Sequence, residues 1–134
     1  MLTLGQLRDW IKAQIPEFRN CIAVGSIDGN KEKFVGVYPL KLPSSAQRIC
    51  LGGAEQTGYQ ERGASILVHW TESVDAAEQK AMEIYRLFYG SSRVVMGESL
   101  AIKIDPGPGP ISVGKDKNGI SEFVVQLKIT YERI

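Results

Sequence analysis

The stretch that decides the fold of this chain is FVVQLKITYE, residues 123–132. Large apolar side chains alternate there with neighbours that are mostly polar, and they stand at Phe123, Val125, Leu127, Ile129 and Tyr131. A period of two buries one face of a strand and leaves the other in water. The stretch therefore predicts a long, half-buried strand in a sheet whose apolar face needs a cover.

The sequence just before this strand predicts a hairpin. Residues 111–115 and the long strand flank an Asn118-Gly119 pair, which favours a tight turn. Upstream, residues 105–110 read Asp-Pro-Gly-Pro-Gly-Pro, and we interpret them as a stiff extended connector. A phosphate-binding loop is disfavoured, because three prolines remove N–H donors and neither GxxxxGK[ST] nor GxGxxG is present.

Two amphipathic helices are predicted to supply the cover. The first starts at Thr3, which forms a capping box with Gln6, and it ends at Pro16. The second starts at Ser73 or Asp75 and stops at Gly90. Its predicted buried stripe consists of Ala77, Ala81, Ile84, Tyr85 and Phe88.

The remaining apolar runs predict further strands. Residues 21–27 and 34–38 surround Asp28-Gly29, which indicates a hairpin. Residues 48–51 predict a short strand, residues 52–63 a long polar loop, and the alternation through Ile66, Val68 and Trp70 another strand. This order predicts one α+β domain over residues 1–134, with an antiparallel or mixed β-sheet and two α-helices packed on one face.

Composition excludes several classes of partner. The 134 residues carry 16 Lys and Arg against 15 Asp and Glu. So balanced a charge does not gather a polyanion, and we expect no specific nucleic-acid binding. The apolar runs are far shorter than the roughly 20 residues that cross a bilayer, and the N-terminus lacks a signal-peptide pattern. We therefore expect a cytosolic origin and no membrane partner.

Residues that carry chemistry are few. The cysteines, Cys21 and Cys50, lie in apolar surroundings and are predicted to be buried thiols on strands. His69 is the one histidine and no CxxC is present, so no metal or other cofactor is expected. We interpret His69 as a structural or rim histidine, since no catalytic signature surrounds it. The sequence offers no convergent polar set for an enzyme.

Several segments together resemble a known family, the small tail terminator proteins of tailed bacteriophages, also described as minor capsid proteins. In the middle of the chain the resemblance rests on Arg62–Trp70, Ser73–Asp75 and the helix Ala76–Phe88. In the C-terminal part it rests on Pro110-Ile111, Gly114-Lys115-Asp116, the turn Asn118-Gly119 and the strand Phe123–Glu132. The early helix and strands fit the same order, so the resemblance covers nearly the whole chain.

This resemblance implies a structural role in the virion, without covalent chemistry. Copies of the chain are expected to form a ring, commonly a hexamer, in the host cytoplasm during assembly. The ring would cap the tail tube protein, halt its growth and meet the head-neck connector proteins. A ring closes head to tail and needs two different patches on each subunit. Two alternatives stay open: another neck or head-completion protein, and a small monomeric domain that binds a ligand or peptide at its sheet edge.

The candidate interface residues come from segments that the predicted core does not use. Tyr59 stands in the polar loop with Arg62 nearby, and both residue types are enriched at interface hot spots. The connector from Lys41 to Gln47 is a second candidate, and the Gly/Pro segment with Pro108 is a third.

Overall fold

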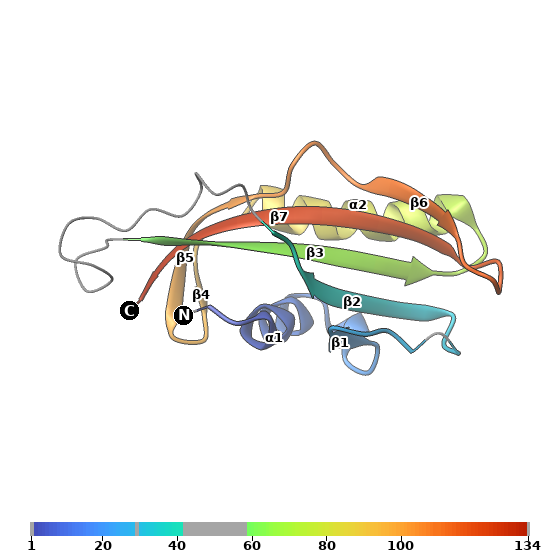
Figure 1. The fold of residues 1–134 in the computed structure, drawn as a ribbon, viewed down its shortest axis with the longest axis horizontal. Helices are drawn as coiled ribbons and strands as arrows, with labels where there is room; N and C mark the ends of the chain where they lie inside the picture. The colour runs from blue at the N-terminus through green and yellow to red at the C-terminus, as the bar shows by residue number, and fades with distance from the viewer. Residues whose placement is uncertain (1, 29, 42–58, 134) are drawn as a thin grey trace.

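The structure is a computed structural model that describes residues 2–28, 30–41 and 59–133 (Figure 1). Its elements in chain order are α1 (Leu4–Gln14), the 3-10 turn η1 (Pro16–Phe18), β1 (Ile22–Val24), β2 (Lys33–Pro39), β3 (Gln60–Trp70), α2 (Val74–Tyr89), β4 (Ser92–Met96), β5 (Ser99–Asp105), β6 (Ile111–Lys115) and β7 (Ser121–Arg133).

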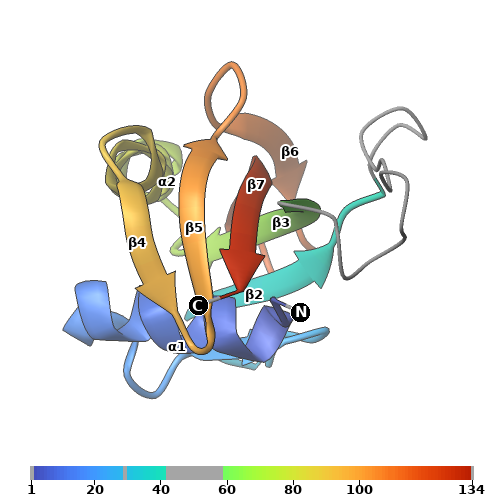
Figure 2. The same cartoon turned by 90° about the vertical axis from the view of Figure 1, so that its left-hand side faces the viewer.

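The strands form one mixed sheet in the order β1-β2-β3-β7-β5-β4, and β6 also pairs with β7. β7 is the predicted long strand. It pairs with β3 along one edge, and with β5 and then β6 along the other. Its alternating side chains from Phe123 to Tyr131 are buried in the core, as predicted. Figure 2 shows how the sheet curls from β2 round to β4 above α1.

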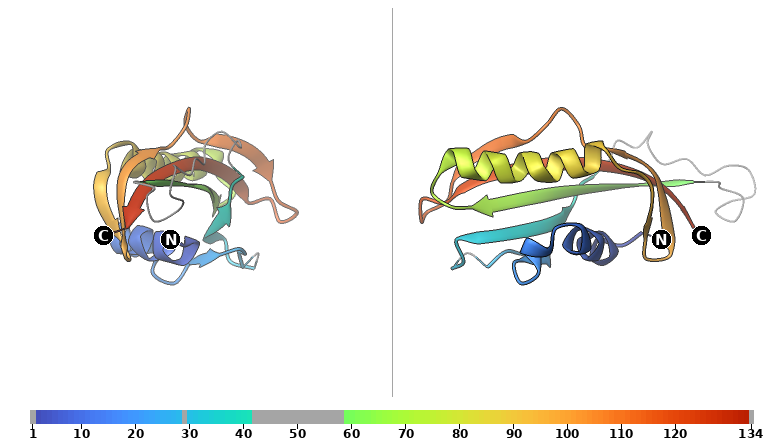
Figure 3. Two further views of the ribbon diagram at one scale, coloured as in Figure 1. Left: turned by 60° about the vertical axis from the view of Figure 1, so that its left-hand side comes forward. Right: turned by 180° about the vertical axis from the view of Figure 1, so that it is seen from behind.

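Both helices cover the same face of this sheet, which confirms the predicted α+β class. Trp10 of α1 and Phe88 of α2 pack with ring centroids 5.5 Å apart, so the two helices meet over the core. Figure 3 shows the pair from behind, with α2 along β7 and α1 near β2. The predicted capping box of Thr3 and Gln6 is present, and Ser73 caps α2.

The predicted hairpin between the first two strands is wrong, because β1 and β2 are parallel. Two hydrogen bonds flank the pair: Val35 N–H donates to the Cys21 carbonyl, and Gly25 N–H donates to the Val37 carbonyl. The chain leaves β1 at Gly25, whose φ is 77°, and returns through polar residues before β2 begins. Gly25 adopts this left-handed conformation without a Cβ penalty, and it redirects the chain where a hairpin was expected.

Two loop predictions are corrected as well. Gln60–Gly63 belong to β3, because the ladder with β7 continues past the apolar part of the strand to Gln60 and Tyr131. The rest of the predicted loop, residues 52–58, and the predicted strand at residues 48–51 lie outside the described residues. The Gly/Pro segment is a turn rather than an extended connector, since Gly107 has a φ of 71° and its N–H donates to the Asp105 carboxylate.

Cys21 departs from its prediction too. It lies just before β1, is only half-buried, and its Sγ is 3.6 Å from the Glu17 carbonyl oxygen. Burial, followed by the nearby Glu17 carboxylate, raises the pKa of this thiol. Cys21 is therefore mostly a neutral thiol at neutral pH. Cys50 lies outside the described residues.

Candidate functional site

Three of the five predicted interface residues lie at one end of the sheet. Leu40 N–H donates to the Gly63 carbonyl at 3.3 Å, which places the exposed Lys41 beside the start of β3. Tyr59 immediately precedes β3, and half of its surface is exposed (50%). Arg62 follows within β3. The strand pairing therefore brings Lys41, Tyr59 and Arg62 to the same end of the sheet, and we call these three residues the β3-start site.

Arg62 is the most enclosed member of the β3-start site. It faces the same side of the sheet as the core residue Ala64, and it lies in register with Ile129. Its Nε atom is buried and has no hydrogen-bond partner among the residues the structure describes. On the opposite side of the sheet, Glu61 is 3.5 Å from Lys128 Nζ. Arg62 therefore contributes to packing as well as to the surface.

The other two predicted residues do not join this site. Pro108 is exposed in the turn between β5 and β6, on the opposite edge of β7 from β3. Gln47 lies outside the described residues. The structure thus separates the Gly/Pro segment from the β3-start site and leaves Gln47 as a prediction.

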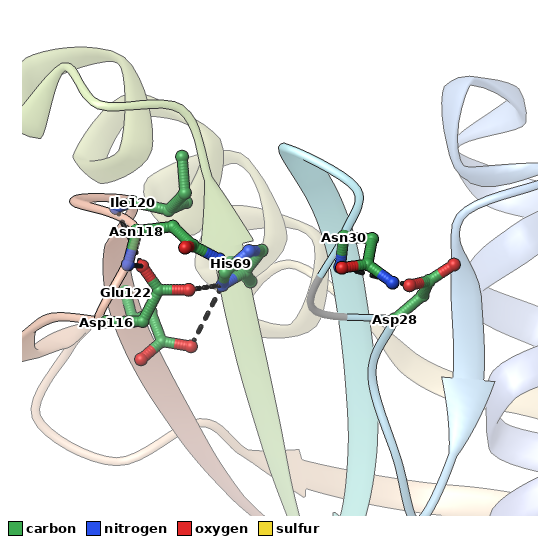
Figure 4. A network of polar contacts seen from close by, with 7 residues as sticks. All are labelled: Asp28, Asn30, His69, Asp116, Asn118, Ile120 and Glu122. Atoms are coloured by element: carbon green, nitrogen blue, oxygen red, sulfur yellow. Dashed lines mark hydrogen bonds and ion pairs between the residues drawn. The ribbon is translucent and has the colours of Figure 1, made fainter.

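A polar cluster that the sequence did not reveal surrounds His69 at the far end of β3 (Figure 4). His69 is fully buried, and its Nδ1 is 3.0 Å from Glu122 Oε2 and 3.7 Å from Asp116 Oδ2. Nδ1–H donates to Glu122, because a carboxylate only accepts. Nε2 is also buried and has no hydrogen-bond partner within the described part of the chain. His69 and its two carboxylates form what we call the His69 clamp.

Asp116 connects the His69 clamp to the β6–β7 turn. Its carboxylate accepts hydrogen bonds from Ile120 N–H and Asn118 N–H, both at 2.9 Å. These hydrogen bonds lower the pKa of Asp116, and the one from Ile120 has the largest effect. The nearby His69 lowers this pKa further. The predicted turn is thus a loop organised by a carboxylate. The clamp holds the β6–β7 hairpin against β3.

Sequence reasoning missed the partners of His69 because it treated the strands separately. His69 and Glu122 are direct cross-strand partners in the β3–β7 ladder. Both stand on the side of their strands that faces away from the core. Aligning the polar faces of the two strands would have brought the pair together.

Several exposed apolar residues were also missed. Ile111 and Val113 of β6 and Val95 of β4 are 43%, 53% and 56% exposed, and Tyr89 at the end of α2 is 73% exposed. Ile111, Val113 and Val95 are the ones that lie on strands at the margins of the sheet. Exposed β-branched residues on edge strands mark sites where a further strand can pair.

Within residues 2–28, 30–41 and 59–133, no three His, Cys, Asp or Glu side chains gather as metal ligands. No described helix is long and apolar enough to cross a membrane.

Comparison with known proteins identifies the family. No curated protein matches the chain. A solved structure named only by a sequence identifier is 17% identical, covers 97% of this chain and 89% of its own, and has a TM-score of 0.46, which is too distant to inform function. The family model described as "Bacteriophage tail terminator protein" matches residues 10–133. That match spans every strand and α2, and the chain therefore belongs to the bacteriophage tail terminator family, a family of structural proteins of the phage tail.

Proposed function

We propose that copies of this chain close into a ring, with six subunits as the family resemblance implies, that caps the tail tube and ends its growth. The same ring offers the surface to which the head-neck connector proteins join. The observation that carries this proposal is the family match over residues 10–133. Covalent chemistry has no part in it, and the described side chains serve packing and contact.

Two features of the fold support a ring. A ring is a head-to-tail assembly, so each subunit needs two different contact surfaces. The sheet ends in unlike strands, β1 and β4, and β6 adds another edge beside β7. The β3-start site supplies a half-exposed tyrosine at one end of the sheet, and tyrosine is enriched at protein contacts.

Tube growth in the presence of the chain tests this function. The cognate tail tube protein is polymerised with increasing amounts of the purified chain, and tube lengths are measured in negative-stain images. We expect tubes to become shorter as the ratio of chain to tube protein rises, with a ring at one tube end. Tube lengths that stay unchanged at equal molar amounts would contradict the proposal.

Variants of the β3-start site then locate the contact. Tyr59→Ala removes an exposed ring, so we expect capping to weaken about tenfold or more while the melting temperature stays the same. Tyr89→Ala is the matched control, because it removes an even more exposed tyrosine from α2. Arg62→Ala is measured beside them for stability, since part of its side chain is buried. Normal capping by Tyr59→Ala would remove this site from the contact.

A further inference from the structure

β6 presents an open strand edge. All five of its residues, Ile111–Lys115, are exposed, and it pairs with β7 on one side. On its other side no strand of the described residues pairs with it. The strand contains no proline, and its one charged residue, Lys115, stands at the end. Proline, charge, cover and β-bulges keep an edge strand from pairing with another chain, and of these β6 has its terminal lysine and a register shift between Ser112 and Gly114, which leaves Ile111 and Ser112 in regular register with β7.

β4 presents a second open edge at the end of the sheet order. It has five residues, like β6, and Val95 is its most exposed apolar side chain. Arg93 interrupts the start of β4, with a φ of 53° and no partner in the β5 register. The remainder, Val94 to Met96, continues in regular register with β5. β4 and β6 lie on opposite sides of the molecule in Figures 1 and 2.

The exposed side chains of the two edges lie on the same face of the sheet. Ile111 is opposite Val124, which is on the face of β7 away from the core. Val95 is opposite Leu100, and Leu100 is opposite Glu132, which lies on that same face of β7. If the two edges paired with each other, Ile111 and Val95 would therefore lie on the same face of the continued sheet. Cross-strand pairs of β-branched residues stabilise a sheet.

We propose that β6 of one copy pairs with β4 of the next copy, so that the sheet continues from subunit to subunit. The inference rests on the proposed ring and names the contact between neighbouring subunits, the pairing of β6 with β4, which we call the joint. The partner is a second copy because the two open edges match in length and in the face of their apolar side chains, yet differ from each other. The two edges lie beyond the same edge of β7 but at different ends of it, and two unlike contact surfaces at separate places on one subunit give the head-to-tail contact that a ring requires.

Lysine variants of the two edges test the joint. Ile111→Lys and Val95→Lys each place a charge on one edge, at side chains exposed enough that the fold tolerates it. Solution mass is measured by light scattering over a wide range of protein concentration. We expect each variant to weaken self-association at least tenfold, and to melt at the wild-type temperature when both are measured at the lowest protein concentration. Tyr89→Lys, on α2 and on neither edge, serves as the control and should assemble like the wild type.

Mixing the two lysine variants distinguishes this joint from a symmetric pairing of β6 with β6. The Val95→Lys chain keeps an intact β6 and the Ile111→Lys chain keeps an intact β4, so an equal mixture should form heterodimers and nothing larger. A chain carrying both Val95→Glu and Ile111→Lys should regain assembly, because each joint then pairs opposite charges. In a β6–β6 pairing, Val95→Lys would assemble normally, and that result would overturn the inference.

The same measurements distinguish the joint from the ring. If the wild type forms rings and both lysine variants do so equally well, the joint is wrong while the proposed function stands. If the wild type is monomeric at every concentration, the joint between free chains is wrong, and the tube-growth measurement decides the proposed function on its own.

Discussion

His69 is buried in the outer face of the sheet, where its imidazole meets two carboxylates from the β6–β7 hairpin. Glu122 approaches from the neighbouring strand and Asp116 from the turn. Because Asp116 also accepts two backbone N–H groups, one side chain both shapes the turn and attaches it to β3. The placement of β6 therefore depends on a few polar atoms in the His69 clamp.

We predict that Asp116 makes the stability of the fold sensitive to acid. Its pKa in the folded chain lies below the ordinary value of 3.8, so its contribution is complete above that pH and is lost as the pH falls through the lowered pKa. Asp116→Asn does not titrate, so its free energy of unfolding should fall less steeply than that of the wild type below about pH 4. Urea unfolding at several pH values measures this. Parallel curves for the two proteins would contradict it.

The His69 clamp also shows what the sequence leaves open at the residue scale. His69 is recognisable as the one histidine, but Glu122 is 53 residues away, and they meet only through the register of β3 and β7. The same holds for Arg62. Its polar neighbours in the sequence predicted a loop, but its pairing with β7 places it in a strand. Register is set by the whole core, so a single segment does not reveal it.

The elements that the sequence predicted best are those with local signals. The capping box at Thr3, the serine cap of α2 and the alternation of β7 each involve residues within a few positions of one another. The pairing of β1 with β2 was predicted wrongly as a hairpin, whereas the two strands are parallel. Direction there depends on the path of the connecting residues and on contacts with α1, neither of which leaves a periodic pattern.

We predict that Gly97, in the turn between β4 and β5, supports the start of α1. Its φ is 61°, and a Cβ there would lie 2.5 Å from the side chain of Gln6, which completes the capping box. Gly97→Ala should cost about 1 kcal/mol for the left-handed backbone and about 1 kcal/mol more for the disturbed cap. Chemical unfolding measures both contributions together.

Gly119→Ala is the matched control for this prediction. Its φ is 81° and nothing lies within 4 Å of the added Cβ, so only the backbone contribution applies. In a Gln6→Ala background, the cost of Gly97→Ala should fall to that of Gly119→Ala, because the cap is already lost. Equal losses for the two glycine variants in the wild-type background would contradict a link between the hairpin and the helix.

At the scale of the whole molecule, the two faces of the sheet differ. One carries both helices and the core, and the other carries a mixture of apolar and polar side chains from β2, β3 and β7. Both open edges, β4 and β6, lie beyond the edge of β7 that is opposite β3, β6 at one end of β7 and β4 beyond β5 at the other. A sheet continued from copy to copy would join these faces into one surface around the ring.

A ring of this kind makes stability depend on concentration. Association stabilises the folded subunit by mass action, so the melting temperature of the wild type should rise by several degrees over a hundredfold increase in protein concentration. The Ile111→Lys variant should show no such rise and should melt like the wild type at its lowest concentration. Differential scanning fluorimetry measures both. A wild-type melting temperature that is independent of concentration would contradict self-association.

β7 has a consequence for how the protein is made. Of the described strands it is the last to leave the ribosome, yet β3, β5 and β6 all pair with it. Until β7 emerges, the nascent chain holds its helices and several strands without the one that joins them, and the sheet completes late through contacts distant in sequence. The β6 edge likewise exists as a strand only once β7 is in place. Synthesis itself thus withholds this edge from other chains until nearly all of the described fold has been translated.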